Sequence, residues 1–177
     1  HTPVRLLYVG RFEPEKQLFK LLKGFKETVA AGAEVTLTLL GDGSQRVALE
    51  KYIMMHSLSS CVMVAPWSND VVSEYQKHDV CVLTSLHEGY ALVLLEAMAA
   101  GMPVITTDVG CVGEVVRDQE HGIVTSVEIT RLSEAIKRMV QVENRVRWGR
   151  AGFKKAEDLQ RSLESYRNDW VASFTKR

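Results

Sequence analysis

The stretch DVCVLTSLHEGYALVLLEAMAAGMPVITTD, residues 79–108, decides the fold. Its two ends, 79–85 and 102–108, are short apolar runs, and the segment between them has a helical pattern that starts near Ala91 and ends at Gly101. Two apolar strands joined by a single helix are typical of a parallel sheet, because a parallel connection must cross back over the sheet. The stretch therefore predicts a strand–helix–strand unit of an α/β protein.

The same alternation extends over most of the chain. Further strands are expected at 4–10, 34–41, 61–65 and, more weakly, 122–125, and further helices at 17–31, 44–57 and 69–77. After residue 127 the pattern is wholly helical, with candidate helices at 128–142, 145–156 and 161–175. Apolar strands with right-handed crossovers predict a doubly wound, Rossmann-like parallel sheet of about six strands. We expect one domain over 1–177, with a core at 4–142 and extra C-terminal helices at 145–177.

The composition is that of an ordinary soluble globular domain. Of the 177 residues, 46% are hydrophobic and 25% charged, and 22 basic residues balance 22 acidic ones. No global charge therefore favours nucleic acid as a partner. Residues 145–177 are locally basic, which indicates a solvated helix face or, alternatively, a patch for anionic lipid or a partner domain.

The three cysteines predict neither a disulfide framework nor a zinc site. Cys61, Cys81 and Cys111 form no C-x-x-C pair and no cluster with histidine. Reduced cysteines suit the cytoplasm, and no apolar run has the length of a membrane span. We expect a cytoplasmic protein, with peripheral association at the cytoplasmic face of the inner membrane as an alternative.

The turns after the predicted strands exclude several nucleotide-binding folds. The first turn, VGRFEPEK (9–16), lacks G-x-G-x-x-G, and the second, GDGSQR (41–46), has arginine where the third glycine would stand. This argues against a dinucleotide dehydrogenase. The chain also has no G-x-x-x-x-G-K-[ST] and no G-x-S-x-G, so P-loop NTPases and serine hydrolases with a nucleophile elbow are excluded.

Two cations and two acids remain as candidates at the carboxyl ends of the strands, where such sheets bind ligands. Arg11 and Lys16 follow the first strand, with Gly10 leaving space, and could converge on one multivalent anion. Glu88 lies in the loop after the fourth strand, and Glu96 lies about one turn inside the following helix, whose N-terminus suits a diphosphate. An acid in that apolar helix needs hydroxyl partners, which ribose or hexose would supply. The alternative for the cations is an exposed, charged loop.

Three segments together resemble a known family. EGYALVLLEAMAAGMPVITTDVG (88–110) contains the E-x7-E signature and is similar to the donor site of the retaining glycosyltransferases grouped as family 4. VGRFEPEKQ (9–17) resembles the family's G-R-x-x-x-x-K phosphate loop, and LLGDGSQR (39–46) its G-D-G turn. The resemblance covers about residues 4–125 in order and spacing, and it implies one half of a GT-B fold of two Rossmann-like domains.

The resemblance implies a role for each matching residue. Arg11 and Lys16 would hold the donor diphosphate, Glu88 would bind hexose hydroxyls, and Glu96 would bind ribose. We take Arg11, Lys16 and Glu88 as the catalytic candidates. The remaining substrate-binding candidates are the glycines of the first two turns, the expected base contacts, and the backbone after Glu88: Gly10, Gly41, Gly43, Pro66, Trp67, Val71, Gly89, Tyr90, Ala91 and Leu92.

One departure from the family leaves the donor open. The family usually has E-G-F-G-L, whereas this chain has E-G-Y-A-L at 88–92. A methyl group at Ala91 would narrow the space beside the donor sugar. The sequence does not choose among UDP-, GDP- and ADP-sugars.

The implied activity is transfer of a hexose, with retention, from a nucleotide diphosphate sugar to a glycan, lipid-linked or other acceptor hydroxyl. Neither a metal nor a cofactor is expected. The acceptor would bind mainly to a first domain that this chain lacks, so we expect the chain alone to be inactive. The alternatives are a non-catalytic sugar-nucleotide-binding module, or another GT-B enzyme such as a nucleotide-sugar epimerase or phosphorylase.

A few further side chains carry expectations of their own. Tyr166, Trp170 and Phe174 form one aromatic stripe, which indicates core packing or, alternatively, contact of the last helix with the first domain. His121 precedes a turn glycine and is expected on the surface. His87 is expected at the surface or behind the site, and Cys111 near the cleft as a small neighbour.

Overall fold

The computed structural model describes residues 2–68 and 70–175. At residue 163 and at residues 166–175 it describes the backbone of the terminal helix but not the side chains. The aromatic stripe predicted at Tyr166, Trp170 and Phe174 therefore lies outside the described side chains.

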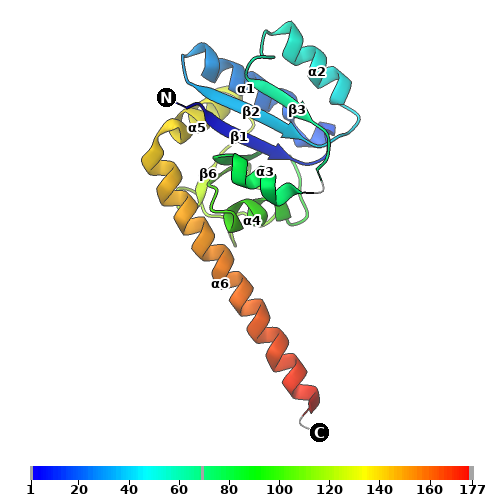
Figure 1. The fold of residues 1–177 in the computed structure, drawn as a ribbon, viewed down its shortest axis with the longest axis vertical. Helices are drawn as coiled ribbons and strands as arrows, with labels where there is room; N and C mark the ends of the chain where they lie inside the picture. Colours follow the sequence, from blue (N-terminus) through cyan, green and yellow to red (C-terminus); the bar gives the residue numbers. More distant parts are fainter. Residues whose placement is uncertain (1, 69, 176–177) are drawn as a thin grey trace.

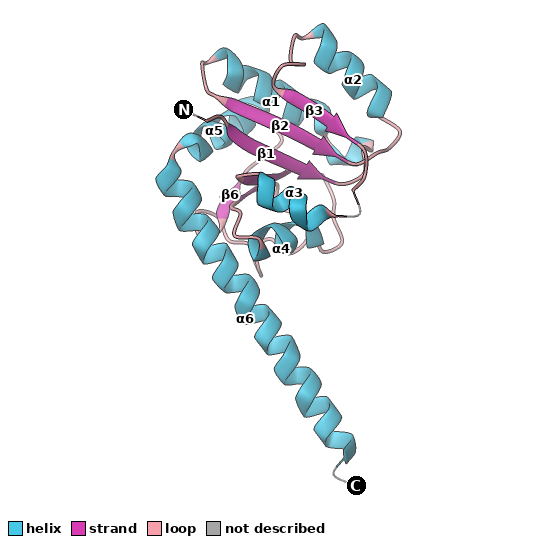
Figure 2. Cartoon of the chain, in the orientation of Figure 1, coloured by secondary structure: helices cyan, strands magenta, loops and turns pink. Residues whose placement is uncertain are grey.

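One parallel sheet forms the centre of the molecule (Figures 1 and 2). Its strands are β1 (Val4–Val9), β2 (Val35–Leu40), β3 (Val62–Ala65), β4 (Val80–Leu83), β5 (Val104–Thr106) and β6 (Gly122–Val124). They lie in the order β3-β2-β1-β4-β5-β6, and every pairing is parallel. This is the Rossmann order, so the predicted doubly wound fold is confirmed. The strand order reverses between β1 and β4.

Helices cover both faces of this sheet. They are a short 3₁₀ turn at Pro14–Lys16, α1 (Leu18–Ala30), α2 (Arg46–Met55), α3 (Val71–Lys77), α4 (Leu92–Ala99), α5 (Ile129–Val140) and α6 (Val142–Thr175). Helix α1 contacts α2 and α5, whereas α4 contacts α6. Figure 1 shows α3 in front of the sheet and α1 behind it. The predicted alternation is thus present, with helix ends that differ by a few residues.

The core explains why the strands read as apolar runs. All four residues of β4 are buried, and β1 and β2 each leave a single residue outside the buried class. Tyr8, Phe12, Phe25 and Trp148 are its largest fully buried aromatic side chains. A sheet covered on both faces has no polar side, so alternation of polar and apolar residues is absent from its central strands.

The two helices predicted at 145–156 and 161–175 are one helix, α6, and that prediction was wrong. The sequence EDLQ at 157–160 contains no glycine or proline that would end a helix. The two glycines inside α6 serve close packing: a Cβ at Gly149 would lie 2.3 Å from the carbonyl oxygen of Gly101, and one at Gly152 would lie 3.2 Å from Cγ of Met98. Figure 1 shows α6 running past the sheet and extending beyond the rest of the domain.

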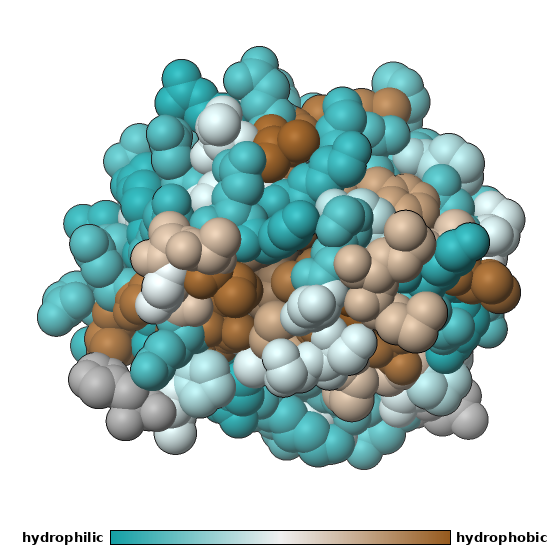
Figure 3. Space-filling view, turned by 90° about the horizontal axis from the view of Figure 1, so that it is seen from above, coloured by the Kyte–Doolittle hydropathy of each residue, from teal (hydrophilic) through white to brown (hydrophobic). Residues whose placement is uncertain are grey.

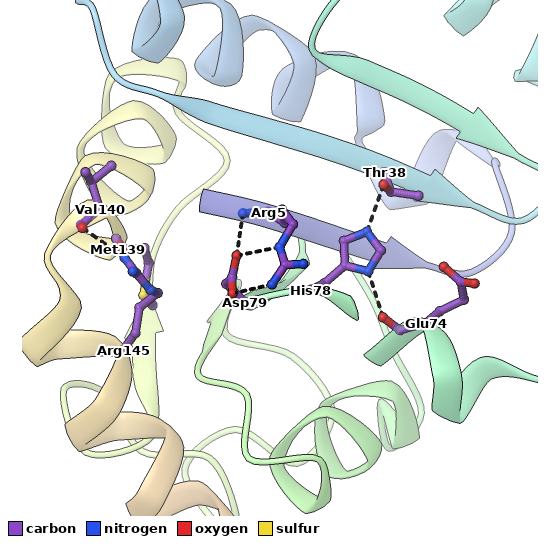
Figure 4. Close-up of polar contacts among 8 residues, drawn as sticks. All are labelled: Arg5, Thr38, Glu74, His78, Asp79, Met139, Val140 and Arg145. Carbon is purple, nitrogen blue, oxygen red and sulfur yellow. Dashed lines mark hydrogen bonds and ion pairs between the residues drawn. The ribbon is translucent and has the colours of Figure 1, made fainter. Parts of the chain in front are cut away.

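Two side chains fix the start of α6 against the domain. Arg145 donates to the carbonyls of Met139 and Val140, which closes the C-terminal end of α5 (Figure 4). The indole N–H of Trp148 donates to the carbonyl of Gln119 at 2.7 Å. The first part of α6 is therefore an integral part of the fold.

His121 is buried, contrary to the surface position predicted for it. Its side chain has 3% exposure, and its Nδ1 accepts the backbone N–H of Arg117 at 3.1 Å. Burial lowers the pKa of His121, and the nearby charge of Glu120 opposes this shift. The turn before β6 folds back onto the ring, an arrangement that the neighbouring glycine does not reveal.

A set of polar contacts joins the amino ends of the central strands (Figure 4). The guanidinium of Arg5 donates from Nε and Nη2 to the carboxylate of Asp79, at 3.0 Å each. Burial by itself raises the pKa of Asp79, but the hydrogen bonds and charge of Arg5 outweigh it and hold the pKa below its usual value. Beside this pair, His78 bridges Thr38 on β2 and the carbonyl of Glu74 on α3.

The face of the molecule seen in Figure 3 carries many hydrophilic residues. Figure 3, which views the molecule from above Figure 1, shows hydrophobic residues gathered in small patches among hydrophilic ones. Several large apolar side chains are exposed, among them Val47, Met54 and Met55 on α2. Within the described residues, no helix has the length and apolar character needed to cross a membrane.

Candidate functional site

The site lies where the strand order reverses, at the carboxyl ends of β1 and β4. Two loops far apart in the sequence meet there through hydrogen bonds to backbone carbonyls. The N–H of Leu86 donates to the carbonyl of Glu15 at 2.7 Å, and the hydroxyl of Thr84 donates to the carbonyl of Lys16 at 2.8 Å. A crevice at such a reversal is the usual ligand site of an open parallel sheet.

Lys16 and Glu88, two of the predicted catalytic residues, are brought together. Nζ of Lys16 lies 2.7 Å from Oε1 of Glu88, and their side chains are only 12% and 16% exposed. The hydroxyl of Ser85 donates to the same oxygen at 2.5 Å. Because both donors use Oε1, the second oxygen of Glu88 accepts no hydrogen bond from the described residues and remains available.

Buried hydroxyl groups hold this arrangement in place. Thr84, Ser85 and Thr107 are all buried at the ends of β4 and β5, and the hydroxyl of Thr107 donates to the carbonyl of Ser85 at 2.6 Å. Sequence reasoning missed these residues. A signal was present, since polar side chains directly after a buried strand need internal partners.

Arg11, the other predicted cation, lies on the surface. Its side chain is 74% exposed, and its nearest acid is Glu15 at 3.6 Å, an exposed pair that contributes little. Its backbone is well fixed, because the hydroxyl of Tyr8 donates to the carbonyl of Arg11 at 2.8 Å. Burial and the charges of Glu88 and Glu15 raise the pKa of Tyr8, so this hydroxyl remains a donor.

Two adjoining cavities form the cleft, one of about 400 Å³ beside Lys16 and Glu88 and one of about 650 Å³ beside α3. Both are lined by Val9, Trp67 and Glu96, so they adjoin at these residues. The predicted site residues that line them are Gly10, Lys16, Trp67, Val71, Glu88, Tyr90, Ala91, Leu92 and Glu96. Arg11, Gly41, Gly43, Pro66 and Gly89 do not line either cavity.

The glycines of the second turn serve packing within the protein. A Cβ at Gly41 would lie 2.0 Å from the carbonyl oxygen of Gly10, and one at Gly43 would lie 2.6 Å from the backbone nitrogen of Phe12. Asp42, between them, accepts the N–H of Phe12 at 2.8 Å through its carbonyl. These glycines let the second turn support the first one, which faces the cleft.

Glu96 has a hydroxyl partner from the protein itself. It lies in the second turn of α4, and its Oε2 accepts the hydroxyl of Tyr75 at 2.7 Å. Tyr75 comes from α3 and is 3% exposed, whereas Glu96 is an exposed residue. The sequence predicted that Glu96 needs a hydroxyl partner. It did not identify Tyr75, because α3 and α4 come together only in the folded domain.

Ala91 begins α4 in a strained conformation. Its φ and ψ are 60° and 55°, the left-handed region that favours glycine, and it is 7% exposed. Its methyl group lies against Gly110, where an added Cβ would be 2.8 Å from that of Ala91. No side chain caps the N-terminus of α4. The backbone conformation at residue 91 therefore favours the glycine that E-G-F-G-L usually has there, apart from any effect on the donor sugar.

Within the part of the chain that the structure describes, no group of three or more His, Cys, Asp and Glu side chains could hold a metal ion. Cys111 is buried beside the site, and its N–H donates to the carbonyl of Tyr90 at 3.1 Å. This agrees with the small packing role expected for it.

Comparison with known proteins agrees with this geometry. The family model described as glycosyl transferases group 1 matches residues 1–155. The chain belongs to this family. It is 30% identical over 174 residues to the capsular polysaccharide biosynthesis glycosyltransferase CapM of Staphylococcus aureus, an alignment that covers 93% of this chain and 46% of CapM. It is 32% identical over 118 residues to the uncharacterized glycosyltransferase MJ1178 of Methanocaldococcus jannaschii, covering 66% and 32%.

Solved structures show the same fold as one part of GT-B glycosyltransferases. The pneumococcal O-GlcNAc transferase GtfA, solved with UDP and GlcNAc, has a TM-score of 0.84 at 21% identity, over 96% of this chain and 35% of GtfA. The C-terminal domain of the group 1 family protein LpcC of Francisella tularensis has a TM-score of 0.80 at 21% identity, over 89% and 87%. The chain spans less than half the length of the curated relatives that it matches.

Proposed function

We propose that the chain is the donor-binding half of a retaining glycosyltransferase, which moves a hexose from a nucleotide diphosphate sugar to an acceptor hydroxyl. The observation that carries this proposal is a cleft of two adjoining cavities, one lined by Lys16 and Glu88 and both lined by Glu96. A cation and two acids in one cleft, each acid with a free acceptor oxygen, suit a diphosphate flanked by two sugars.

Each group then has a role that its surroundings support. Lys16 keeps two N–H donors beyond its bond to Glu88 and would bind the diphosphate. The uncapped N-terminus of α4 would add backbone N–H groups and a favourable dipole. The free oxygen of Glu88 would accept a hexose hydroxyl. Glu96 would accept ribose hydroxyls, and Trp67 and Val71 would border the base.

Arg11 would join the site only when the donor is bound. Its long, exposed side chain is free to swing toward the diphosphate, because the weak pair with Glu15 does not hold it. A guanidinium fork matches phosphate oxygens well. This assigns Arg11 to leaving-group binding in the complex.

The proposed chemistry is mainly electrostatic. Breaking the anomeric C–O bond leaves negative charge on the diphosphate, and Lys16, Arg11 and the α4 N-terminus would stabilise that charge. Loss of one such preorganised donor typically costs about 100- to 1000-fold in rate. Since the chain's own groups neutralise the leaving group, we propose that the reaction needs neither a metal nor a cofactor.

The acceptor would bind to a first domain, and the outer part of α6 would pack back toward it. We propose that the acceptor group is the hydroxyl of a glycan, of a lipid-linked molecule or of another acceptor. Nine Lys/Arg against four Asp/Glu over 145–177 support a secondary proposal, peripheral contact of the complete enzyme with anionic lipid.

Calorimetry of the chain against UDP-, GDP- and ADP-sugars tests the proposal. UDP-sugars come first, because the related structures of GtfA and of TarM from S. aureus contain UDP. We expect one nucleotide class to bind, and Lys16→Ala to abolish that binding without loss of folding. An exposed lysine of α1, changed as Lys23→Ala, is the matched control. Failure of every nucleotide sugar to bind would refute the proposal.

A further inference from the structure

Tyr75 connects the two helices that border the larger cavity. Its ring belongs to α3 and is buried, and its hydroxyl reaches Oε2 of Glu96 on α4 at 2.7 Å. Burial raises the pKa of Tyr75, so the hydroxyl keeps its proton and acts as the donor. The charged carboxylate strengthens this hydrogen bond relative to a neutral one.

Helix α3 is only seven residues long, yet it is fixed at both ends. Asp70 caps its start by accepting the N–H of Ser73 at 3.1 Å. At its end, His78 must donate through Nδ1 to the carbonyl of Glu74, since a carbonyl only accepts. The other ring nitrogen meets the hydroxyl of Thr38 on β2 at 2.9 Å (Figure 4). The ring of Tyr75 is therefore held in a defined place.

Glu96 by contrast is exposed and would otherwise be free to change rotamer. The hydrogen bond holds Oε2 toward α3 and leaves Oε1 without a hydrogen-bond donor among the described residues. Glu96 lines both parts of the cleft, so this oxygen is available to a ligand there. A carboxylate fixed before binding loses less entropy when the ligand arrives.

We propose that Tyr75 is a positioning residue that presents the carboxylate of Glu96 to the ribose of the donor nucleotide. The inference rests on the proposed function, because it assigns the ribose to Glu96. The same contact would connect recognition of the base with recognition of the ribose. Val71 and Tyr75 of α3 line the part of the cleft expected to hold the base, and Tyr75 also holds Glu96, which would bind the ribose.

The test compares Tyr75→Phe with Tyr52→Phe by calorimetry on the 177-residue chain. Tyr52 is a matched control on α2, where its hydroxyl makes no hydrogen bond to the described residues. The ligands are the tightest-binding of UDP, GDP and ADP, and the 2′,3′-dideoxy form of the same nucleotide. Circular dichroism of each variant verifies that the fold is kept.

Tyr75→Phe should weaken binding of the ribonucleotide about 3- to 10-fold, the net effect expected for loss of one intramolecular hydrogen bond that acts on the ligand only through Glu96. It should leave the dideoxy form within about twofold, because that ligand has no hydroxyls for Glu96 to accept. In a Glu96→Ala background, Tyr75→Phe should have no further effect.

Two results would overturn the inference while leaving the proposed function intact. One is an equal loss of affinity for both ligands in Tyr75→Phe, which would mean a merely structural role. The other is unchanged affinity for the ribonucleotide. Absence of binding to all three nucleotides in the unaltered chain would instead refute the proposed function, and the inference with it.

Discussion

One oxygen of Glu88 accepts hydrogen bonds from both Lys16 and Ser85, and the sequence did not predict the bond from Ser85. Ser85 is fully buried, and we expect its hydrogen bond to help set the direction in which the carboxylate of Glu88 faces. Lys16 then pairs with the same oxygen and is held in the cleft. At this scale the site depends on hydroxyl groups that do not line the cleft themselves.

Changing Ser85 to alanine should weaken donor binding about 10-fold, since one hydrogen bond to a charged group is lost. Calorimetry with the preferred nucleotide sugar measures this. Ser162→Ala, an exposed serine of α6, is the control and should change nothing. Unaltered affinity in Ser85→Ala would show that Lys16 alone positions Glu88.

Ala91 gives a prediction of stability. The left-handed conformation destabilises the folded state by about 1–2 kcal/mol for any residue with a Cβ atom. Glycine avoids this cost, but it loses more backbone entropy on folding, which offsets part of the gain. Ala91→Gly should therefore stabilise the domain by about 0.5–1 kcal/mol in urea denaturation. Ala100→Gly, at a residue with φ −82°, should destabilise by about 0.5–1 kcal/mol. Similar losses in both variants would contradict the assigned strain.

At the scale of elements, the turn before β6 contains the buried His121. Burial lowers the pKa of its ring, so the unfolded chain binds the proton more readily than the folded chain does. Stability that is present above pH ~6.5, the ordinary pKa of histidine, should be lost as the pH falls below it. Asp79 and Glu13 have lowered pKa values, so their protonation changes the stability only below about pH 4. They therefore do not contribute to a loss of stability between pH 7 and pH 5.

Urea denaturation at pH 7, 6 and 5 measures this effect. His121→Gln should flatten the loss of stability between pH 7 and pH 5, because glutamine does not titrate. The exposed His87 provides the control, and His87→Gln should keep the pH dependence of the unaltered chain. A His121→Gln profile parallel to the unaltered one would rule out His121 as its source.

Helix α6 has two parts with different effects on stability. Trp148 is fully buried, donates to the carbonyl of Gln119, and lies under the guanidinium groups of Arg138 and Arg147. Trp148→Ala should cost about 3–5 kcal/mol. Removal of residues 161–177 should lower the thermal midpoint by less than about 3 °C, the shift expected for roughly 1 kcal/mol. Thermal denaturation followed by circular dichroism compares the two, and unfolding of the shortened chain would contradict this division of α6.

For the whole molecule, the cleft is open on one side. Trp67 and Leu92 border it and are 58% and 62% exposed, although large apolar groups beside a ligand are usually covered. We expect the chain alone to bind the donor weakly and to transfer no sugar, because a donor bound there would face water and no acceptor. A radiolabelled-donor assay with a broad acceptor mixture checks this, and efficient transfer by the chain alone would contradict it.

The sequence by itself determined the strands, most helices and the order of the motifs, because burial and helical periodicity are local properties of the chain. It placed Lys16 and Glu88 in the loops after the correct strands and Glu96 in the helix that follows, and the sheet order brings these segments together. It did not reveal the partners of these residues. Lys16 and Glu88 are 72 residues apart, and Tyr75 and Glu96 are 21 apart, so their hydrogen bonds exist only once the strands are ordered. Burial of His121 and exposure of Arg11 were likewise decided by tertiary contacts, which no local pattern encodes.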